Sequence, residues 1–298
     1  MIRLFDPHIH MTSRTTDDYE AMYQAGIRAI VEPAFWLGEP RTHVGSFEDY
    51  FLSLVGWERF RSSQFGIRHF CTMGLNPKEA NNPRLAEGVL QILPRYLEKD
   101  GVVAVGEIGY DDVTEAEDKC MKAQIELAQV HGLPVLIHTP HRNKKTGTER
   151  TLAVVKESGL APERYIVDHN NEETIRATLE AGCWAGHSIY PGTKMDETRM
   201  VALIKQYGPE RIIINSAADW GKSDPLKVPK TAQAMLAAGL SEATVTRVCW
   251  DNPRDFFAQS GRLDVATLEQ ELAVDQTQLH AENSVLRGQS PLVTPKAG

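Results

Sequence analysis

Eight short apolar segments recur along the chain, and amphipathic segments separate most of them. A short apolar run is typical of a buried parallel strand, whereas apolar residues three and four apart are typical of a helix. The alternation predicts a parallel sheet with helical crossovers, and eight such units favour a (β/α)8 TIM barrel, an α/β fold. The expected strands are residues 2–6, 27–32, 67–74, 102–107, 134–138, 165–169, 183–187 and 211–216.

Two regions exceed a minimal barrel. Residues 33–66, after the second strand, are rich in aromatic side chains, and we expect an inserted helix over 47–61 that packs on the barrel rim or walls a pocket. The barrel itself is placed at residues 1–260, and 261–298 are expected to form a C-terminal helix and a flexible tail. The heptad positions of that helix, which indicate packing on the barrel or on a second subunit, are Val265, Leu268, Leu272, Leu279 and Leu286.

Composition narrows the class of protein. The 298 residues suffice for one large domain, and a net charge of -8 argues against general nucleic-acid binding. The four cysteines are far apart and form no CxxC pair, which argues against a finger-type zinc site and a disulfide framework. No charged-then-apolar leader precedes the first expected strand, so we expect a cytoplasmic protein. No apolar stretch approaches the roughly 18 residues that a membrane span requires.

Residue types that bind metals stand at the ends of the expected strands. His8 and His10 follow the first strand at a spacing that places alternate side chains on one face, and a nearby carboxylate such as Asp6 can orient one imidazole. Four later strands end in Glu107, His138, His169 and Asp219. A barrel gathers the C-terminal ends of its strands into one site. Six ligand-type residues exceed the three that one catalytic zinc uses, so they favour two divalent ions of Zn, Mn, Fe or Ni.

The order of these motifs resembles that of the TatD-like metal-dependent hydrolases of the amidohydrolase superfamily. The most specific piece is Gly-Glu-Ile-Gly-Tyr-Asp at 106–111, and Asp-Pro-His-Ile-His stands at 6–10. The later motifs are His138 after an apolar run, Asp168-His169 and Ala218-Asp219. The resemblance covers about residues 1–257 and implies a (β/α)8 barrel with two metals. It further implies one ion on His8, His10 and Asp219, a second on His138 and His169, and a bridging Glu107.

The family is associated with phosphoester cleavage, including cleavage of DNA. Around the ligands this chain differs from the common family pattern, because Asn170 replaces a Cys after His169 and Ala217-Ala218 replaces Glu-Thr before Asp219. We therefore expect a small-molecule substrate rather than DNA. Hydrolysis of an amide or lactone, a nuclease activity and a non-catalytic metal-binding scaffold are the alternatives, and a homo-oligomer is left open.

The predicted mechanism is attack of metal-activated water on a phosphoester, with Asp219 and Glu107 as the catalytic residues. Asp219 would accept the proton of the water and return it to the leaving group. A basic cluster after the fifth strand either clamps a phosphate or faces water. The candidate substrate contacts are His141, Arg142 and Lys144 of this cluster, together with His187, Tyr110 and Trp220.

Overall fold

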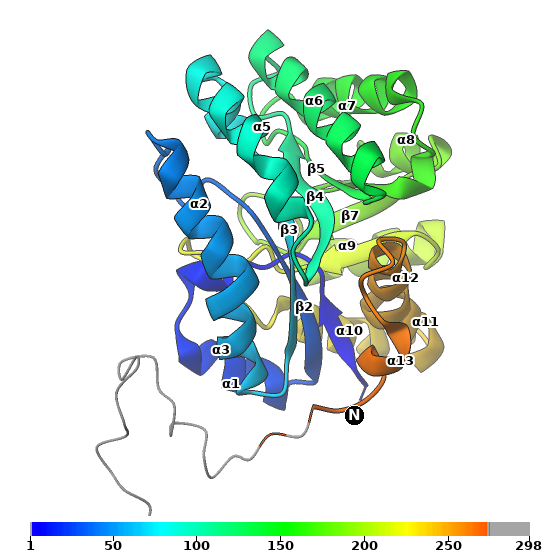
Figure 1. Ribbon diagram of the computed structural model, residues 1–298. Helices are drawn as coiled ribbons and strands as arrows, with labels where there is room; N and C mark the ends of the chain where they lie inside the picture. The colour runs from blue at the N-terminus through cyan, green and yellow to red at the C-terminus, as the bar shows by residue number, and fades with distance from the viewer. Residues whose placement is uncertain (1, 273, 275–298) are drawn as a thin grey trace, which may run out of the picture.

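The computed structural model describes residues 2–272 and 274. It confirms the expected barrel, because eight parallel strands stand side by side in chain order around one sheet (Figure 1). The strands are β1 (Leu4–Asp6), β2 (Ile27–Pro33), β3 (Arg68–Met73), β4 (Val102–Gly109), β5 (Val135–His138), β6 (Tyr165–Val167), β7 (Trp184–Ser188) and β8 (Ile212–Asn215). Each begins or ends within about three residues of its predicted boundary.

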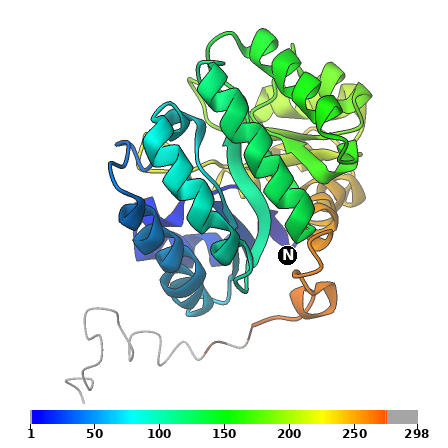
Figure 2. The same cartoon turned by 45° about the horizontal axis from the view of Figure 1, so that its top comes forward.

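Helices cover the outside of the sheet, as two views of the chain show (Figures 1 and 2). They are α1 (Thr16–Gln24), α2 (Val44–Leu52), α3 (Arg59–Ser63), α4 (Pro77–Ala80), α5 (Pro83–Leu97), α6 (Glu115–His131), α7 (Lys144–Ser158), α8 (Ile175–Glu180), α9 (Glu197–Tyr207), α10 (Lys227–Ala237), α11 (Glu242–Thr246), α12 (Asn252–Ala258) and α13 (Val265–Leu268). Local sequence explains their ends. Helix α6, for example, begins at a reciprocal capping box between Thr114 and Glu117 and ends at Gly132 in the left-handed conformation.

The first and last strands meet through the segments that follow them. Ala217 donates its backbone N–H to the carbonyl of His8, and His10 donates to the carbonyl of Ala218, both at 2.8 Å. The backbone N–H of Ser216 donates to Asp6 Oδ1 at 3.2 Å. The seam of the barrel is therefore closed by the segments that carry three of the candidate ligands.

A cluster of buried apolar side chains joins the strands to α12, which covers the N-terminal ends of the strands. The ring of Phe5 lies 6.2 Å from those of Trp250 and Phe257, measured between ring centres. Asn252 Nδ2 donates to the carbonyl of Ile212 at 2.6 Å, which fixes α12 to the start of β8. Burial of each large ring contributes roughly 1.5–3 kcal/mol. This end of the barrel stabilises the fold and leaves the opposite end for the candidate site.

The inserted helix is confirmed. Helical structure runs from α2 through a π-helical turn (Ser53–Glu58) into α3, and so begins three residues before the predicted position. It packs on α5, where a Cβ at Gly88 would lie 2.6 Å from the side chain of Val44. The ring centres of Phe51 and Tyr96 lie 5.1 Å apart in the same interface. Phe47, Tyr50 and Phe51 of the helix thus belong to the core, whereas the loop before it reaches the candidate site.

The C-terminal segment forms less helix within the described residues than the heptad pattern indicates. Helix α13 has one turn, and Leu272 lies beyond its end. Glu269 accepts a hydrogen bond from Trp250 Nε1 at 3.0 Å, and Leu268 is buried, so contacts with the barrel fix the chain where a longer helix would continue. Leu279, Leu286 and the expected flexible tail lie outside the described residues. Among those that the structure describes, no helix has the length and apolar character to cross a membrane.

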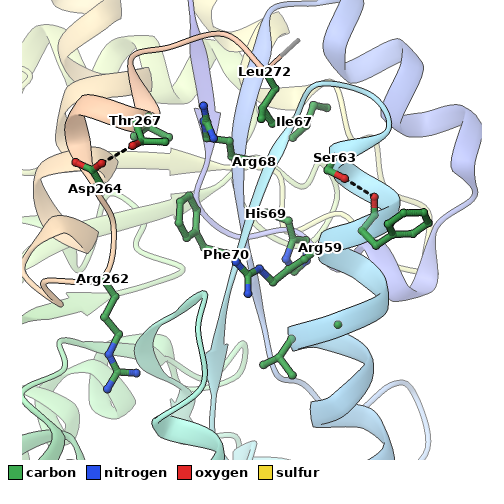
Figure 3. Close-up of a pocket in the computed structure, with 14 residues that line it drawn as sticks. Arg59, Ser63, Ile67, Arg68, His69, Phe70, Arg262, Asp264, Thr267 and Leu272 are labelled. Atoms are coloured by element: carbon green, nitrogen blue, oxygen red, sulfur yellow. Dashed lines mark hydrogen bonds between the residues drawn. The ribbon is translucent and has the colours of Figure 1, made fainter. Parts of the chain in front are cut away.

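A cavity of about 530 Å³ opens near the start of β3 (Figure 3). Arg59, Arg68 and Arg262 line it. Each guanidinium donates to main-chain carbonyl groups, those of Arg59 and Arg262 in the segment 97–102 and that of Arg68 at Gln270. We infer that these arginines hold the segment 97–102 and the chain near Gln270 in place, at the face of the barrel opposite to the candidate ligands.

Candidate metal centre

The first group of ligand atoms lies between the end of β1 and the middle of β4. His8 Nε2 and His10 Nε2 are 3.0 Å apart, and Glu107 Oε1 is 3.7 Å from His8 Nε2. One ligand atom from each of the three side chains lies within 4.8 Å of the other two, and all three residues are buried. Glu107 stands inside β4, two residues before the strand ends, and not at its end as predicted.

The second group shares Glu107 with the first. Glu107 Oε1 lies 3.0 Å from His138 Nδ1 and 3.3 Å from His169 Nε2, and these two nitrogens are 3.0 Å apart. Burial favours the neutral carboxyl, yet His138, His169 and His8 hold the pKa of Glu107 well below its usual range. Asn76 Nδ2 donates to the other carboxylate oxygen at 3.0 Å. Glu107 Oε1 thus lies within 3.7 Å of the imidazole nitrogens of His8, His138 and His169.

The donor chemistry of both groups fits a divalent cation. Burial lowers the pKa of His10 and of His169 well below the usual value, so both rings are neutral near pH 7. Neutral imidazole is the form that binds a metal, and two imidazole nitrogens with one carboxylate oxygen suit Zn, Mn, Fe or Ni. In each group two ring nitrogens converge at 3.0 Å, and these nitrogens would hold a shared cation through their lone pairs.

Asp168 supports the first group, a role that could not be predicted from its place in the sequence. Its Oδ2 lies 2.6 Å from His8 Nδ1, and Asn215 Nδ2 donates to both of its oxygens at 3.1 Å. Despite burial, the neighbouring His169 and His8 lower the pKa of Asp168 far below its usual value. The interaction fixes the orientation of His8 with Nε2 toward the ligand group. Asp6 acts differently, because its Oδ1 accepts the backbone N–H of His8 at 3.3 Å.

Two local features allow these side chains to meet. A Cβ at Gly186 of β7 would lie 2.5 Å from Asp168 Oδ1, so any larger residue there would displace the carboxylate. His169 adopts a φ of 63°, the left-handed region that non-glycine residues rarely occupy. Its Nδ1 lies 2.7 Å from the hydroxyl of Ser188, which turns Nε2 toward Glu107. In the sequence only the Asp-His dipeptide indicates these two side chains. The residues that they contact, Gly186 and Ser188, lie on β7.

A cavity of about 350 Å³ opens above the two groups. The ring of Phe35 stacks on His10 at 3.6 Å between centres, and Trp36 meets Trp220 edge to face at 6.0 Å. Trp220 is 53% exposed, so these rings form the mouth of the cavity. The loop before the inserted helix and the loop after β8 therefore define the entrance.

Asp219 lies on the cavity wall but belongs to neither ligand group. Its Oδ1 accepts a hydrogen bond from Gly221 N at 2.8 Å and one from the Tyr190 hydroxyl at 3.2 Å. Its assignment as a ligand of the first ion therefore stays a prediction. Its place at the wall equally suits a group that exchanges a proton with a substrate or a water molecule.

Of the six candidate substrate contacts, two line the cavity and four lie outside its lining. His141 and Trp220 line the cavity. Arg142 has an 81% exposed side chain and pairs with Asp112 at 3.2 Å, away from the cavity lining. Lys144 donates to the hydroxyl of Thr139 at 2.9 Å. The expected basic cluster is thus dispersed, because α7 begins at Lys144 and directs its neighbours to different surfaces.

Tyr110 and His187 are buried away from the cavity. Tyr110 donates its hydroxyl hydrogen bond to Asp118 of α6. His187 Nδ1 lies 3.0 Å from the carbonyl of Ala185, and burial lowers the pKa of His187 to about 4. Neither residue appears in the cavity lining. The strand-end pattern identified the correct region of the barrel for both but could not assign the direction of their side chains.

Two lysines line the cavity in place of the dispersed cluster. Lys78 follows β3, and Lys194 follows β7. Lys78 Nζ pairs with Asp111 at 2.8 Å and lies 5.1 Å from the Trp36 ring centre. The sequence signal was a lysine shortly after a strand end, which is too common in barrels to single out either residue.

A parallel eight-stranded barrel with buried histidine and glutamate groups at one end defines the class of metal-dependent hydrolases. Residues 5–258 match the family model described as TatD related DNase, and the chain belongs to this family. The resemblance found in the sequence motifs is thus confirmed.

Similar proteins agree with this assignment. An uncharacterized metal-dependent hydrolase of Methanocaldococcus jannaschii is 26% identical over 257 residues, which cover 85% of this chain and 99% of that protein. The crystal structure of the TatD-like protein of Archaeoglobus fulgidus has a TM-score of 0.71 and 28% identity, and covers 85% of this chain and 99% of its own. The phosphotriesterase homology protein of Escherichia coli has a TM-score of 0.65 at 14% identity, covers 86% of this chain and 99% of its own, and shows a shared fold.

Proposed function

We propose that this protein hydrolyses a small-molecule phosphoester with the aid of two divalent cations. The observation that carries the proposal is the sharing of Glu107 Oε1 between two His-containing groups at the floor of one cavity. A shared carboxylate oxygen suits two ions about 3.5–4 Å apart, the spacing of two-metal hydrolytic sites. A cavity of about 350 Å³ suits a small ligand, and its lysines suit an anionic one.

The chain supplies positioning and proton transfer in the proposed reaction. Two bound divalent ions supply Lewis acidity and lower the pKa of water at the site. Glu107, held ionised by the surrounding histidines, fixes the geometry of both groups. Asp219, the other carboxylate in the described cavity lining, accepts the proton of the attacking water and returns it to the leaving oxygen. Trp36 and Trp220 restrict the access of bulk water.

Nuclease activity is the second candidate, because the family model carries the description of a DNase. The net charge of -8 and the small cavity favour a small substrate over a duplex. A neutral amide or lactone would leave Lys194 of the cavity without an anionic partner. These three substrate classes can be separated directly.

The test is a substrate panel on protein reconstituted with Zn²⁺ or Mn²⁺. We expect turnover of p-nitrophenyl phosphate or bis(p-nitrophenyl) phosphate, its loss on chelation with EDTA, and its recovery when metal is restored. Turnover of a lactone alone, or cleavage of single-stranded DNA alone, would contradict the proposal in favour of the corresponding alternative. No metal-dependent turnover on any member would favour a binding scaffold.

Metal content gives an independent prediction. Elemental analysis of the reconstituted protein should give about two divalent ions per chain. His8→Ala and His138→Ala each remove one nitrogen ligand from a different group, so each should lower the content toward one ion and abolish turnover. Circular dichroism should show an intact fold, because both side chains lie above the packed barrel interior. One ion in the unmodified protein would indicate a mononuclear site.

A further inference from the structure

Lys194 is a cation of the cavity with no carboxylate partner. Within residues 2–272, no carboxylate oxygen lies within 4.0 Å of its Nζ, and the amine lies 5.3 Å from the centre of the Tyr190 ring. Lys78, the other lysine of the described cavity lining, pairs with Asp111, whereas Arg142 and Lys144 lie outside the lining and contact Asp112 and Thr139. Burial lowers the pKa of the Lys194 ammonium group, so its charged form becomes more favourable when an anion enters the cavity.

We propose that Lys194 binds the phosphoryl oxygens of the substrate and that the loop of residues 188–195 holds it in position for this contact. The assignment rests on the proposed function and deepens it, because it names the side chain that recognises the anionic group.

The lining of the cavity places Lys194 beside both ligand groups. The same cavity is lined by Lys194, by His8, His10 and Glu107 of the first group, by His138 and His169 of the second, and by Asp219. A phosphoryl group positioned over both groups would therefore lie within reach of this amine. Cations in the two groups would compensate Glu107 and leave Lys194 to an incoming anion.

The loop of residues 188–195 is fixed at several points. Ile189 and Met195 pair in a short parallel bridge, and Met195 N donates to the carbonyl of Ser188 at 3.2 Å. Lys194 N donates to the carbonyl of Tyr190 at 2.9 Å. Arg199 Nη1 donates to the Lys194 carbonyl at 2.7 Å. The backbone of Lys194 is thus held from both sides, which limits the entropy lost when its side chain meets a ligand.

Side chains connect this loop to the metal centre and to Asp219. Ser188 contacts His169 Nδ1 at 2.7 Å, and Tyr190 donates to Asp219 Oδ1 at 3.2 Å. Arg199 is itself fixed by a two-bond ion pair with Glu172, at 2.6 and 2.8 Å. Glu172 and Arg199 are therefore positioning residues for Lys194, one step removed from the substrate.

The experiment compares Lys194→Met with Lys194→Arg and with the control Lys205→Met. Lys205 is an exposed residue of α9 whose Nζ donates to the carbonyl of Ala238 at the end of α10. The probe is inorganic phosphate, titrated calorimetrically into the metal-loaded protein. We expect phosphate to bind about tenfold more weakly to Lys194→Met and kcat/KM for phosphoesters to fall about 100-fold, with the metal content unchanged. Lys194→Arg should recover part of both losses, and Lys205→Met should match the unmodified protein.

Phosphate affinity within twofold of the unmodified value in Lys194→Met would overturn the inference, as would failure of the unmodified protein to bind phosphate. A failure of the proposed function would give a different result, namely turnover of a lactone alone or cleavage of DNA alone in the substrate panel. Glu172→Gln tests the positioning role. It should weaken phosphate binding several-fold without altering the metal content or the far-UV circular dichroism, whereas a general loss of structure would change all three.

Discussion

Glu107→Gln is expected to lower kcat for phosphoesters by roughly 10³-fold or more. The reason is the position of Oε1, which lies within 3.7 Å of His8, His138 and His169 and so belongs to both ligand groups. A neutral amide removes the negative charge that would hold two cations together. Elemental analysis and steady-state kinetics on the same preparation should therefore show a joint loss of metal and activity.

The matched control for this substitution is Glu98→Gln, at the exposed end of α5. It should leave the metal content and kcat unchanged. Retention of both ions and of activity within tenfold in Glu107→Gln would contradict a shared carboxylate. A change confined to one ion would assign Glu107 to a single group.

Asp219→Asn should lower kcat by about 10²–10⁴-fold while both ions remain bound. Asp219 lies outside the two ligand groups, at the cavity wall, where its carboxylate can accept a proton and an amide cannot. The hydrogen bond from Gly221 N can be kept by the amide oxygen, so the loop should retain its conformation. The measurements are kcat, KM and metal content after dialysis.

Asp49→Asn, on the exposed face of α2, is the control and should behave as the unmodified protein. Loss of one ion in Asp219→Asn would show that Asp219 is a ligand, as the family resemblance implies. Retained ions with kcat within threefold of the unmodified value would exclude Asp219 as the proton acceptor.

The barrel could be predicted from the sequence because its signal is local. Each strand is a short apolar run such as 102–107, and each crossover has helical periodicity, so neighbouring residues contain the information. The gathering of His8, His10, Glu107, His138 and His169 could also be predicted, since the fold brings strand ends together. A sequence pattern of this kind identifies the end of the barrel where a side chain lies.

Contacts between distant residues could not be predicted in this way. His8 and Asp168 are 160 residues apart, and only the closed barrel places Nδ1 beside the carboxylate. Arg142 is a candidate substrate contact by sequence, but the start of α7 directs it outward to Asp112. Lys194 lies beyond a strand end in a loop whose shape depends on Arg199, so its direction has no local signal.

The seam between the first and last strands couples folding to metal binding. His8 and Ala217, like His10 and Ala218, share backbone hydrogen bonds that form only when β8 has joined the sheet. A growing polypeptide that still lacks its last strand would hold the imidazoles of His8 and His10 without this support. Cations bound there would in turn stabilise the closed barrel relative to any conformer in which the seam is open, because only the closed barrel holds both histidines in place.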